Sequence, residues 1–569
     1  MKIAFTQFLG ANSDVSDELL QPNYAVEATN VFTDQGALDT WKGLNPVGIS
    51  PVWNSKTGAN KQLFLMQNSL WLAWPVATDV ALLQMANNSE WQVAFSDLQD
   101  ASSTAGPKYT SLSLAVAGGG TGYPTTFHPL GIIAPTAKLV ATVIAKPAPA
   151  NSVILSWEVA GTVTDAISNR IARTYVYTFV NDKGREGPPS ASSDIAYSND
   201  DETITLSGFI AAPQVDITKI RIYVASSGGT FNFLKESAAS TANISITNNT
   251  IGAAITSTTY SPPPDNLQGI TAMANGMLVG YVNNNLYFSE PYQSHAWPED
   301  YIKSVDYPIK GLAAIGNMLY ISTDSYPLIS VGNTPAFMSF AKLGAIQANV
   351  SNRSMVNMGV GVMYASRDGI VLLATGQASM VSEGIISERA FQAMVPSSIH
   401  AYFYRDKYIG FYNSGLTGAI VLDSGETLPA KGGFILDYKR KTVSYTDVYC
   451  DAAFSDKLGG KLYLSILSAD TNKLYEWNEG STNLTQAWKT KPVQTEPMNF
   501  SIARVLAKRY PFTFQLYADD TLKHTQTVTS QEPFRLPSGY RGRKWAARIT
   551  GDTYINSIFL STSVMELMQ

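Results

Sequence analysis

Short apolar runs that alternate with polar residues fill residues 267–485. They come in pairs around Gly, Asn or Asp turns, as residues 277–282 and 285–288 do. Period-two alternation of β-branched and aromatic residues between turn residues is typical of β-hairpins. The hairpins recur about every 40 residues, which is the spacing of β-propeller blades. This pattern predicts an all-β, propeller-like core.

A second pattern, in residues 136–266, interrupts that core. Longer β-branched and aromatic runs lie at 153–157, 173–180 and 217–224, with proline-rich stretches on both sides. About 110 residues with a tryptophan on a strand are typical of an immunoglobulin or fibronectin III-like sandwich. We predict that this sandwich is inserted into the core as a peripheral decoration or a bridge between subunits.

Four segments follow from these patterns. We assign residues 1–135 to the N-terminal part of the β-propeller-like core, where short strands lie between Gly, Pro and Asn clusters. Residues 136–266 hold linkers and the inserted fibronectin III-like β-sandwich, and residues 267–485 hold the remainder of the core. Residues 486–569 form a basic C-terminal β domain. One helix is predicted near residues 387–394, with Ser387 as its N-cap and Pro396 as its stop.

Charge is sparse and unevenly distributed. Charged residues make up 15% of the chain, against about 25% in average domains. The net charge of −5 argues against a dedicated nucleic-acid binder. Residues 486–569 carry 11 Lys and Arg against 6 Asp and Glu, so they have a balance of +5 and the rest of the chain has −10. The basic side chains near predicted strand ends are Arg504, Lys508, Arg509, Arg535, Arg541, Arg543 and Lys544. We expect them to form a docking patch or a solvated face rather than a site for DNA phosphates, because no aromatic residues are interleaved with them for base stacking.

No pattern of reactive residues stands out. The four histidines, His128, His295, His400 and His524, lack zinc-ligand spacing, and we interpret His295 as a packed residue. The single cysteine, Cys450, excludes an internal disulfide and fits a buried small hydrophobe. We therefore predict no catalytic, cofactor-binding or metal-binding residues and no enzyme activity.

Three segments with acidic residues have both a chemical and a structural interpretation. Ser-Arg-Asp-Gly at 366–369 matches half of the Asp-box turn of sialidase-type propellers, but Asp-Gly is also a common tight-turn pair, and we favour the turn. The acids at 200–202 and 519–520 fit solvated loops better than an acid/base pair.

Several spaced motifs, in order along the chain, resemble a known family. They are Phe-Leu-Gly at 8–10, Leu-Gln-Pro at 20–22, Ala-Thr-Asn at 28–30, Gly-Ala-Leu at 36–38, Ser-Glu-Pro-Tyr at 289–292, His-Ala-Trp-Pro at 295–298, Ser-Asn-Arg-Ser at 351–354, Tyr-Ala-Ser-Arg-Asp-Gly at 364–369 and Phe-Arg-Leu-Pro at 534–537. Together they resemble the tail nozzle, or tail tube, proteins of short-tailed bacteriophages. The resemblance covers most of the chain and brings no catalytic residues with it.

The resemblance implies a virion structural protein. Such a protein forms a homo-oligomeric ring, of six subunits by the family's pattern, that extends the DNA channel of the tail and takes part in genome ejection and host attachment. The implied partners are head-to-tail adaptor or connector proteins, tail fibres or tip and needle proteins, and double-stranded DNA in transit. The implied location is the virion tail, assembled in the cytoplasm of the bacterial host.

A different class of function stays open on the residues alone. A propeller could be a receptor-binding tail protein that recognises host polysaccharide and hydrolyses it with paired carboxylates at its mouth. Ring assembly and glycan binding distinguish the two hypotheses. The N-terminus lacks a signal-peptide pattern, and no run of about eighteen apolar residues predicts a membrane span.

Overall fold

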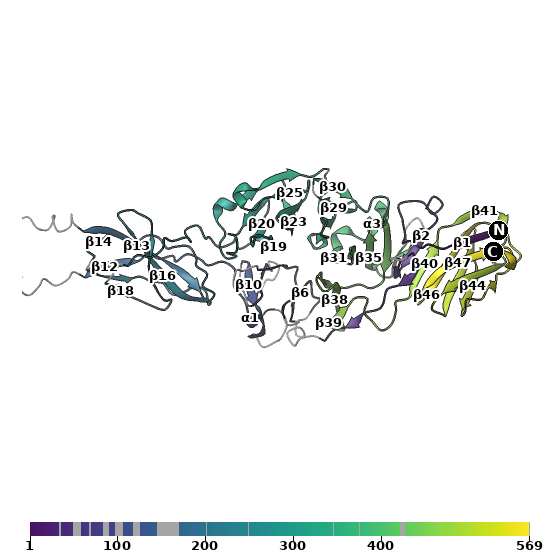
Figure 1. Ribbon diagram of the computed structural model, residues 1–569, viewed down its shortest axis with the longest axis horizontal. Coiled ribbons are helices and arrows are strands. Elements are labelled where there is room, and N and C mark those ends of the chain that lie inside the picture. The colour runs from purple at the N-terminus through teal and green to yellow at the C-terminus, as the bar shows by residue number, and fades with distance from the viewer. Residues whose placement is uncertain are drawn as a thin grey trace, which may run out of the picture.

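The computed structural model is elongated, with three parts in a row (Figure 1). The sandwich lies at one end, the propeller-like core in the middle, and a β domain that holds both termini at the other end. The structure describes residues 1–33, 36–48, 58–67, 70–83, 90–96, 106–117, 124, 126–144, 170–200, 202–247, 250–344, 346–374, 376–421 and 427–567. The all-β fold class predicted from the sequence is confirmed, with its propeller-like core, inserted sandwich and C-terminal β-sandwich.

Seven small sheets of the described chain make up the core. Their inner strands are β6 (Gln62–Leu65), β8 (Asp79–Leu82), β19 (Gln268–Ala272), β23 (Ile309–Ile315), β27 (Val356–Asn357), β31 (His400–Tyr404) and β37 (Ala452–Asp456). In the same order, the outer strands of the first three sheets are β7 (Trp71–Trp74); β9 (Gln92–Ser96), β10 (Lys108–Ser111) and β11 (His128–Pro129); and β20 (Leu278–Val282), β21 (Asn285–Phe288) and β22 (Lys303–Ser304). Those of the fourth and fifth sheets are β24 (Met318–Thr323), β25 (Leu328–Val331) and β26 (Ser339–Lys342); and β28 (Val362–Ala365), β29 (Ile370–Ala374) and β30 (Gln377–Met380). Those of the sixth and seventh sheets are β32 (Lys407–Asn413), β35 (Lys431–Asp437) and β36 (Thr442–Thr446); and β38 (Lys461–Ser468), β39 (Thr471–Glu476) and β5 (Asn45–Pro46).

Hydrophobic side chains between neighbouring sheets hold this ring together. Each pair of adjacent sheets encloses its own buried cluster, because both faces of these strands carry apolar residues. The last sheet meets the first in the same way, where Ala452 and Leu474 pack with Leu63, Trp71 and Ala73. The sheets therefore form a continuous ring by packing, although no described sheet closes on itself by hydrogen bonds.

A strand from the N-terminal part of the chain also completes the ring of sheets; we call this pairing the clasp. β5 pairs with β39, so that the last sheet takes its outermost strand from residues far upstream. Asn45 faces Glu476 and Pro46 faces Tyr475. The backbone N–H of Val47 then donates to the carbonyl of Leu474 at 2.9 Å. Pro46 is tolerated because β5 is an edge strand.

The inserted sandwich has two sheets. One contains β12 (Val140–Ile144), β15 (Thr203–Ser207) and β18 (Ile244–Ile246), and the other contains β14 (Ala196–Ser198), β13 (Ile171–Asn181), β16 (Ile217–Ser226) and β17 (Asn232–Ala238). Tyr175, Tyr177 and Phe179 alternate inward along β13 and meet Ile220 and Ile222 of β16. The strand predicted at 153–157 lies outside the described residues.

The C-terminal domain joins two sheets. The first contains β1 (Lys2–Phe5), β47 (Ile555–Ser561), β42 (Ile502–Ala507) and β45 (Phe534–Arg535). The second adds β2 (Ala25–Thr29), β40 (Gln486–Thr490), β46 (Gly542–Gly551), β43 (Phe512–Ala518), β44 (Thr521–Val528) and β41 (Val493–Met498) to the β31–β36 sheet, which thereby reaches ten strands. The contact between β2 and β36 is parallel, at Thr29 and Tyr445.

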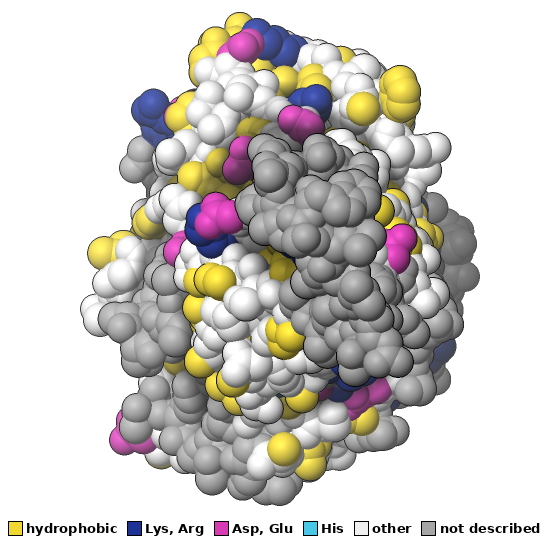
Figure 2. Space-filling view, turned by 90° about the vertical axis from the view of Figure 1, so that its left-hand side faces the viewer, with side chains coloured by type: hydrophobic (Ala, Val, Ile, Leu, Met, Phe, Trp, Pro, Cys, Tyr) yellow, Lys and Arg dark blue, Asp and Glu magenta, His cyan; other side chains and the backbone are white. Residues whose placement is uncertain are grey.

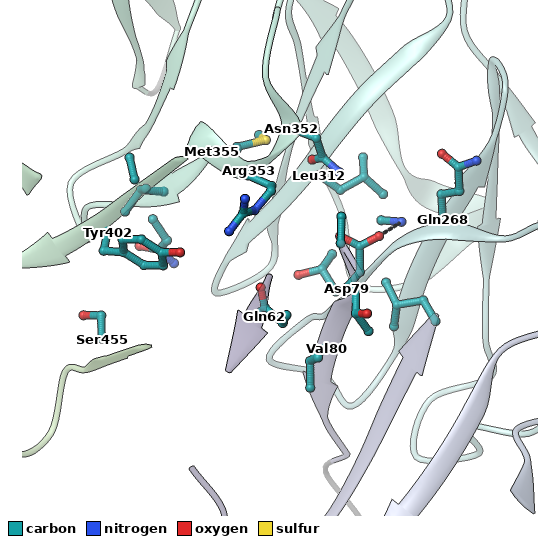
Figure 3. A pocket seen from close by; sticks show the side chains of 18 of the residues that line it. Gln62, Asp79, Val80, Gln268, Leu312, Asn352, Arg353, Met355, Tyr402 and Ser455 are labelled. Atoms are coloured by element: carbon teal, nitrogen blue, oxygen red, sulfur yellow. Dashed lines mark hydrogen bonds between the residues drawn. The ribbon is translucent and has the colours of Figure 1, made fainter. Parts of the chain in front are cut away.

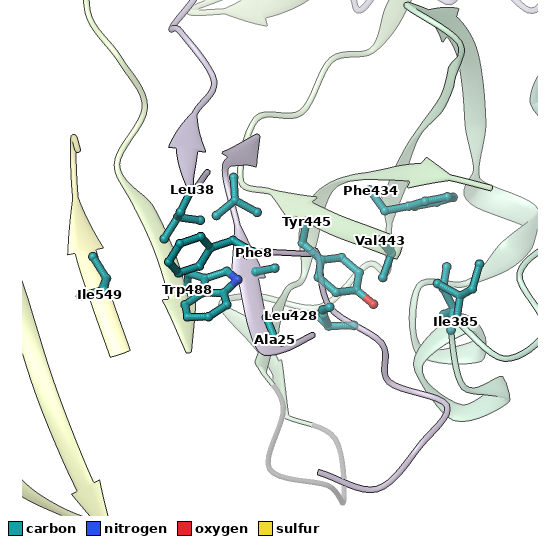
Figure 4. Close-up of a cluster of buried hydrophobic side chains, with 14 of the residues drawn as sticks. Phe8, Ala25, Leu38, Ile385, Leu428, Phe434, Val443, Tyr445, Trp488 and Ile549 are labelled. Atoms are coloured by element: carbon teal, nitrogen blue, oxygen red, sulfur yellow. The ribbon is translucent and has the colours of Figure 1, made fainter. Parts of the chain in front are cut away.

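This domain corrects one assignment made from the sequence. Residues 1–135 were expected to belong to the core, but β1 pairs with β47 and β2 pairs with β40. Phe8 packs edge-on against Trp488 with ring centroids 4.9 Å apart, and Figure 4 shows both rings in the apolar cluster between the core and the C-terminal strands. The sequence of a short alternating strand does not specify its partner, so it could not show that β1 and β2 belong to the C-terminal domain.

A few elements complete the fold. The predicted helix is confirmed as α3 (Glu388–Ala393). Ser387 is its N-cap, as predicted, since its hydroxyl accepts a hydrogen bond from the backbone N–H of Ala390. Other described elements include α1 (Leu112–Ala117), α4 (Val564–Leu567), and the strand pairs β3 (Val31–Phe32) with β4 (Asp39–Thr40) and β33 (Ala419–Val421) with β34 (Thr427–Pro429). The described helices are too short to cross a membrane.

Candidate functional site

A cavity of about 420 Å³ lies where the inner strands of the ring converge (Figure 3). Every one of the seven inner strands, or the residues next to it, contributes to its wall. The lining includes Gln62, Asp79, Gln268, Leu312, Val356, Tyr402 and Ser455. Amide and hydroxyl groups therefore face the centre of the ring, while apolar residues fill the spaces between sheets.

Asp79 is the carboxylate of this cavity. Its Oδ2 accepts hydrogen bonds from the backbone N–H of Gly269 at 2.7 Å and the hydroxyl of Ser96 at 3.5 Å. Burial raises the pKa of Asp79, and hydrogen bonds from Gly269, Ser96 and Asn352 offset part of that rise. Gly269 has φ of +66°, and a Cβ there would lie 2.3 Å from the ring of Tyr281, so glycine allows this close approach. Asp79 thus ties neighbouring sheets together.

Two cations also connect sheets across the cavity. Nη2 of Arg353 donates to the carbonyls of Lys61, at 2.7 Å, and Asp451, at 2.8 Å, which directly precede β6 of the first sheet and β37 of the last. Nζ of Lys457 donates to the carbonyl of Asn357 and lies 5.1 Å from the ring centroid of Phe403. Burial lowers the pKa of Lys457. The charged groups of the cavity are therefore used as braces within the ring.

The acidic groups of the cavity differ from those of a typical glycosidase. A glycosidase of the usual kind places two carboxyl groups about 5–10 Å apart, whereas Asp79 is the single carboxylate among the side chains that line the described cavity. Within the described ranges no three His, Cys, Asp or Glu side chains are grouped as metal ligands. The residues 366–369 form the β28–β29 turn, in which the backbone N–H of Ser366 donates to the carbonyl of Gly369 at 2.8 Å.

The residues that could suggest a nucleophile are buried and neutral. His400 stacks on Phe411, with centroids 5.6 Å apart, and its Nδ1 lies 3.2 Å from the hydroxyl of Tyr402. Burial lowers the pKa of His400 well below its usual value and raises the pKa of Cys450 well above it. A reactive cysteine needs the opposite shift, toward the thiolate. Cys450 is the buried small residue that the sequence predicts.

The motif at 351–354 lies at the centre of this bracing. The hydroxyl of Ser351 donates to the carbonyl of Ile399. The hydroxyl of Ser354 donates to the carbonyl of Ser351 at 2.6 Å and accepts from the backbone N–H of Ala365 at 2.8 Å. The carbonyl of Ser354 in turn accepts from the hydroxyl of Tyr408 at 2.9 Å. The sequence analysis did not predict these hydrogen bonds, although polar residues between apolar strands are a pattern that points to buried structural contacts.

The motif at 289–298 reaches the inserted sandwich. Nε2 of His295 lies 2.9 Å from the carbonyl of Glu186, and the backbone N–H of Trp297 donates to the carbonyl of Ser261 at 2.8 Å. His295 is thus a packed residue, as we expected. His128 lies beside Tyr109, and His524 is on β44.

Acidic residues from the other end of the chain lie beside several basic residues of the C-terminal domain. Residues 1–40 carry one Lys and six Asp and Glu, a balance of −5, and their strands complete the domain whose other part has +5. Glu27 pairs with Arg548 at 2.6 Å and Asp39 pairs with Arg509 at 2.7 Å. Lys544 is paired with Asp520 at 2.9 Å. The exposed arginines of the predicted patch are Arg535, Arg541 and Arg543.

Comparisons with known proteins identify no family. No family model and no curated protein matches the chain. Among solved structures, it is similar to the extracellular domain of a one-component system from B. thetaiotaomicron (9% identity, 65% of this chain and 48% of that chain, TM-score 0.22). It is also similar to an exo-β-1,3-galactanase of Phanerochaete chrysosporium (7%, 63% and 93%, 0.22) and to a sialidase of Trypanosoma rangeli (9%, 91% and 96%, 0.21). The chain spans about half the length of the first of these. None of these likenesses indicates a function.

Proposed function

We propose that the chain is a virion structural protein of a short-tailed bacteriophage, a subunit of the tail nozzle ring that extends the DNA channel. One observation carries the proposal. The motifs that resemble the tail nozzle family make structural contacts. Arg353 connects the first and last sheets of the propeller-like core, and His295 contacts the inserted sandwich. These motif residues hold parts of the fold together, which supports a structural role for the protein.

The surface and the shape of the molecule fit this role. In the end view of Figure 2, charged side chains lie singly or beside one of opposite sign, and the described part of this face shows no large patch of one sign. A ring subunit needs such a surface for contacts with its neighbours. The net charge of −5 suits a channel for DNA, because a bore without excess Lys and Arg does not hold phosphates.

The proposal includes its partners. The subunits assemble as a homo-oligomeric ring, six by the family resemblance, with adaptor proteins above it and fibres or tip proteins attached to it. Double-stranded DNA passes through without specific binding. The competing hypothesis, a receptor-binding propeller that hydrolyses polysaccharide, lacks the second carboxylate at the described cavity.

Electron microscopy tests the proposal directly. Negative-stain images of the purified chain should show rings, and gold-labelled antibodies against the chain should bind the tail tip of intact virions. A chain that stays monomeric at every concentration and binds host polysaccharide would overturn the proposal in favour of the receptor-binding hypothesis.

A further inference from the structure

A loop of the inserted sandwich is buried against the propeller-like core. The loop follows β13, and its Arg185 is only 4% exposed. Nη2 of Arg185 donates to Oε1 of Gln92 on β9 at 2.5 Å, and its guanidinium carbon lies 4.7 Å from the ring centroid of Tyr109 on β10. An arginine from the sandwich is thus held by the second sheet of the core.

The same contact continues into the sandwich through a buried acid. The hydroxyl of Tyr109 donates to Oδ2 of Asp216 at 3.3 Å, and Nδ2 of Asn181 lies 3.2 Å from the same oxygen. Oδ1 of Asn181 accepts from the backbone N–H of Arg185 at 3.0 Å, which fixes the shape of the loop. Asp216 is 5% exposed. Hydrogen bonds between buried groups therefore join the two sides away from water.

His295 makes a separate contact, from the third sheet of the core. Its Nε2 is within 2.9 Å of the carbonyl of Glu186, and its ring meets the ring of Tyr260 edge-on at 5.8 Å. Tyr260 lies on the segment that leads out of the sandwich. We call Gln92, Tyr109, Asn181, Arg185, Glu186, Asp216 and His295 the polar joint.

The two segments that connect the sandwich to the core also touch each other. A Cβ on Gly131 would lie 2.5 Å from Cβ of Pro262 and 2.5 Å from Cδ of Pro263. Nε2 of Gln214 donates to the carbonyl of Gly131 at 2.8 Å. Both connections are therefore packed at the base of the sandwich, where a hinge would need free backbone.

We propose that the polar joint locks the inserted sandwich to the propeller-like core as a rigid arm with one orientation. Motion between domains of one chain is the usual expectation unless their interface is extensive. Here a swing of the arm would separate Arg185 from Gln92 and Tyr109. It would also separate Asp216 from the hydroxyl of Tyr109, and His295 from the carbonyl of Glu186. The arm carries its outer strands at a fixed angle to the ring, so a contact made at its end moves the core with it.

Pulsed electron paramagnetic resonance tests the lock. Spin labels are attached to cysteines at Ser245→Cys on the arm and Ala341→Cys on β26, both of which are exposed. The native Cys450 is fully buried and should not react with the label. We expect one narrow distance distribution in the parent, and at least a twofold wider one after Arg185→Ala.

A control and a milder variant make the outcome decisive. Lys219→Ala removes a cation of the same sandwich that pairs with Glu236 and lies outside the polar joint, and it should leave the distribution unchanged. Tyr109→Phe removes only the hydroxyl that reaches Asp216 and serves if Arg185→Ala does not fold. A parent distribution as wide as those of the variants, or folded variants as narrow as the parent, would overturn the proposal.

Discussion

Replacing Arg353 by alanine should destabilise the propeller-like core, because this side chain connects the first and last sheets. Its two hydrogen bonds, of 2.7 and 2.8 Å, go to the carbonyls of Lys61 and Asp451. A hydrogen bond from a charged donor contributes about 1.5–3 kcal/mol. Arg353 is half-buried, so the lower end applies to each bond. The expected loss in the free energy of unfolding is about 3 kcal/mol.

Urea unfolding followed by tryptophan fluorescence measures this loss, since Trp71 and Trp477 are buried in the two sheets concerned or beside them. The matched control is Arg367→Ala, an exposed arginine in the β28–β29 turn, which should stay within about 0.5 kcal/mol of the parent. Arg353→Lys should lose part of the stability, because one ammonium lacks the planar fork of a guanidinium. If Arg353→Ala unfolds at the same urea concentration as the control, the bracing role is wrong.

Three further outcomes are expected. Burial lowers the pKa of His295 to about 3, so this side chain binds a proton more readily in the unfolded state than in the folded state. The free energy of unfolding should therefore fall by about 3 kcal/mol from pH 7 to pH 4. In unfolding experiments at both pH values, His295→Gln should remove that part of the fall. Leu63→Ala, in the cluster that joins the last sheet to the first, should cost about 2–5 kcal/mol in the same urea assay. Changing Arg541 and Arg543 to Glu should slow ring assembly, followed by light scattering, more at low than at high salt if these arginines dock on a neighbouring subunit; equal rates across salt concentrations would favour a solvated face.

Local patterns sufficed to predict most strands and the sandwich. Residues 173–180 and 217–224 alternate with period two and pair as β13 and β16, and the helix after Ser387 follows from its cap. These features depend on neighbours in sequence, which a single chain records directly.

The cavity and the charge balance could not be predicted in this way. Asp79 and Arg353 lie far apart in sequence, and only the closed ring brings them to one cavity. The predicted +5 domain loses its net charge because acids such as Glu27 arrive on strands from the other end of the chain. Partner choice between short strands depends on the whole fold, so these features need the structure.

The clasp between β5 and β39 determines when the core can be completed during synthesis. About 430 residues separate Pro46 from its partner Tyr475, and at about 5–20 residues per second the ribosome needs roughly 20–90 s to make them. Until then β5 has no partner, and the first sheet lacks the Ala452 and Leu474 that cover Leu63. The inserted sandwich, whose strands lie within one continuous stretch, can fold in that interval. The core therefore stays incomplete for most of its synthesis, and a truncated chain that lacks β39 should be a substrate for proteases.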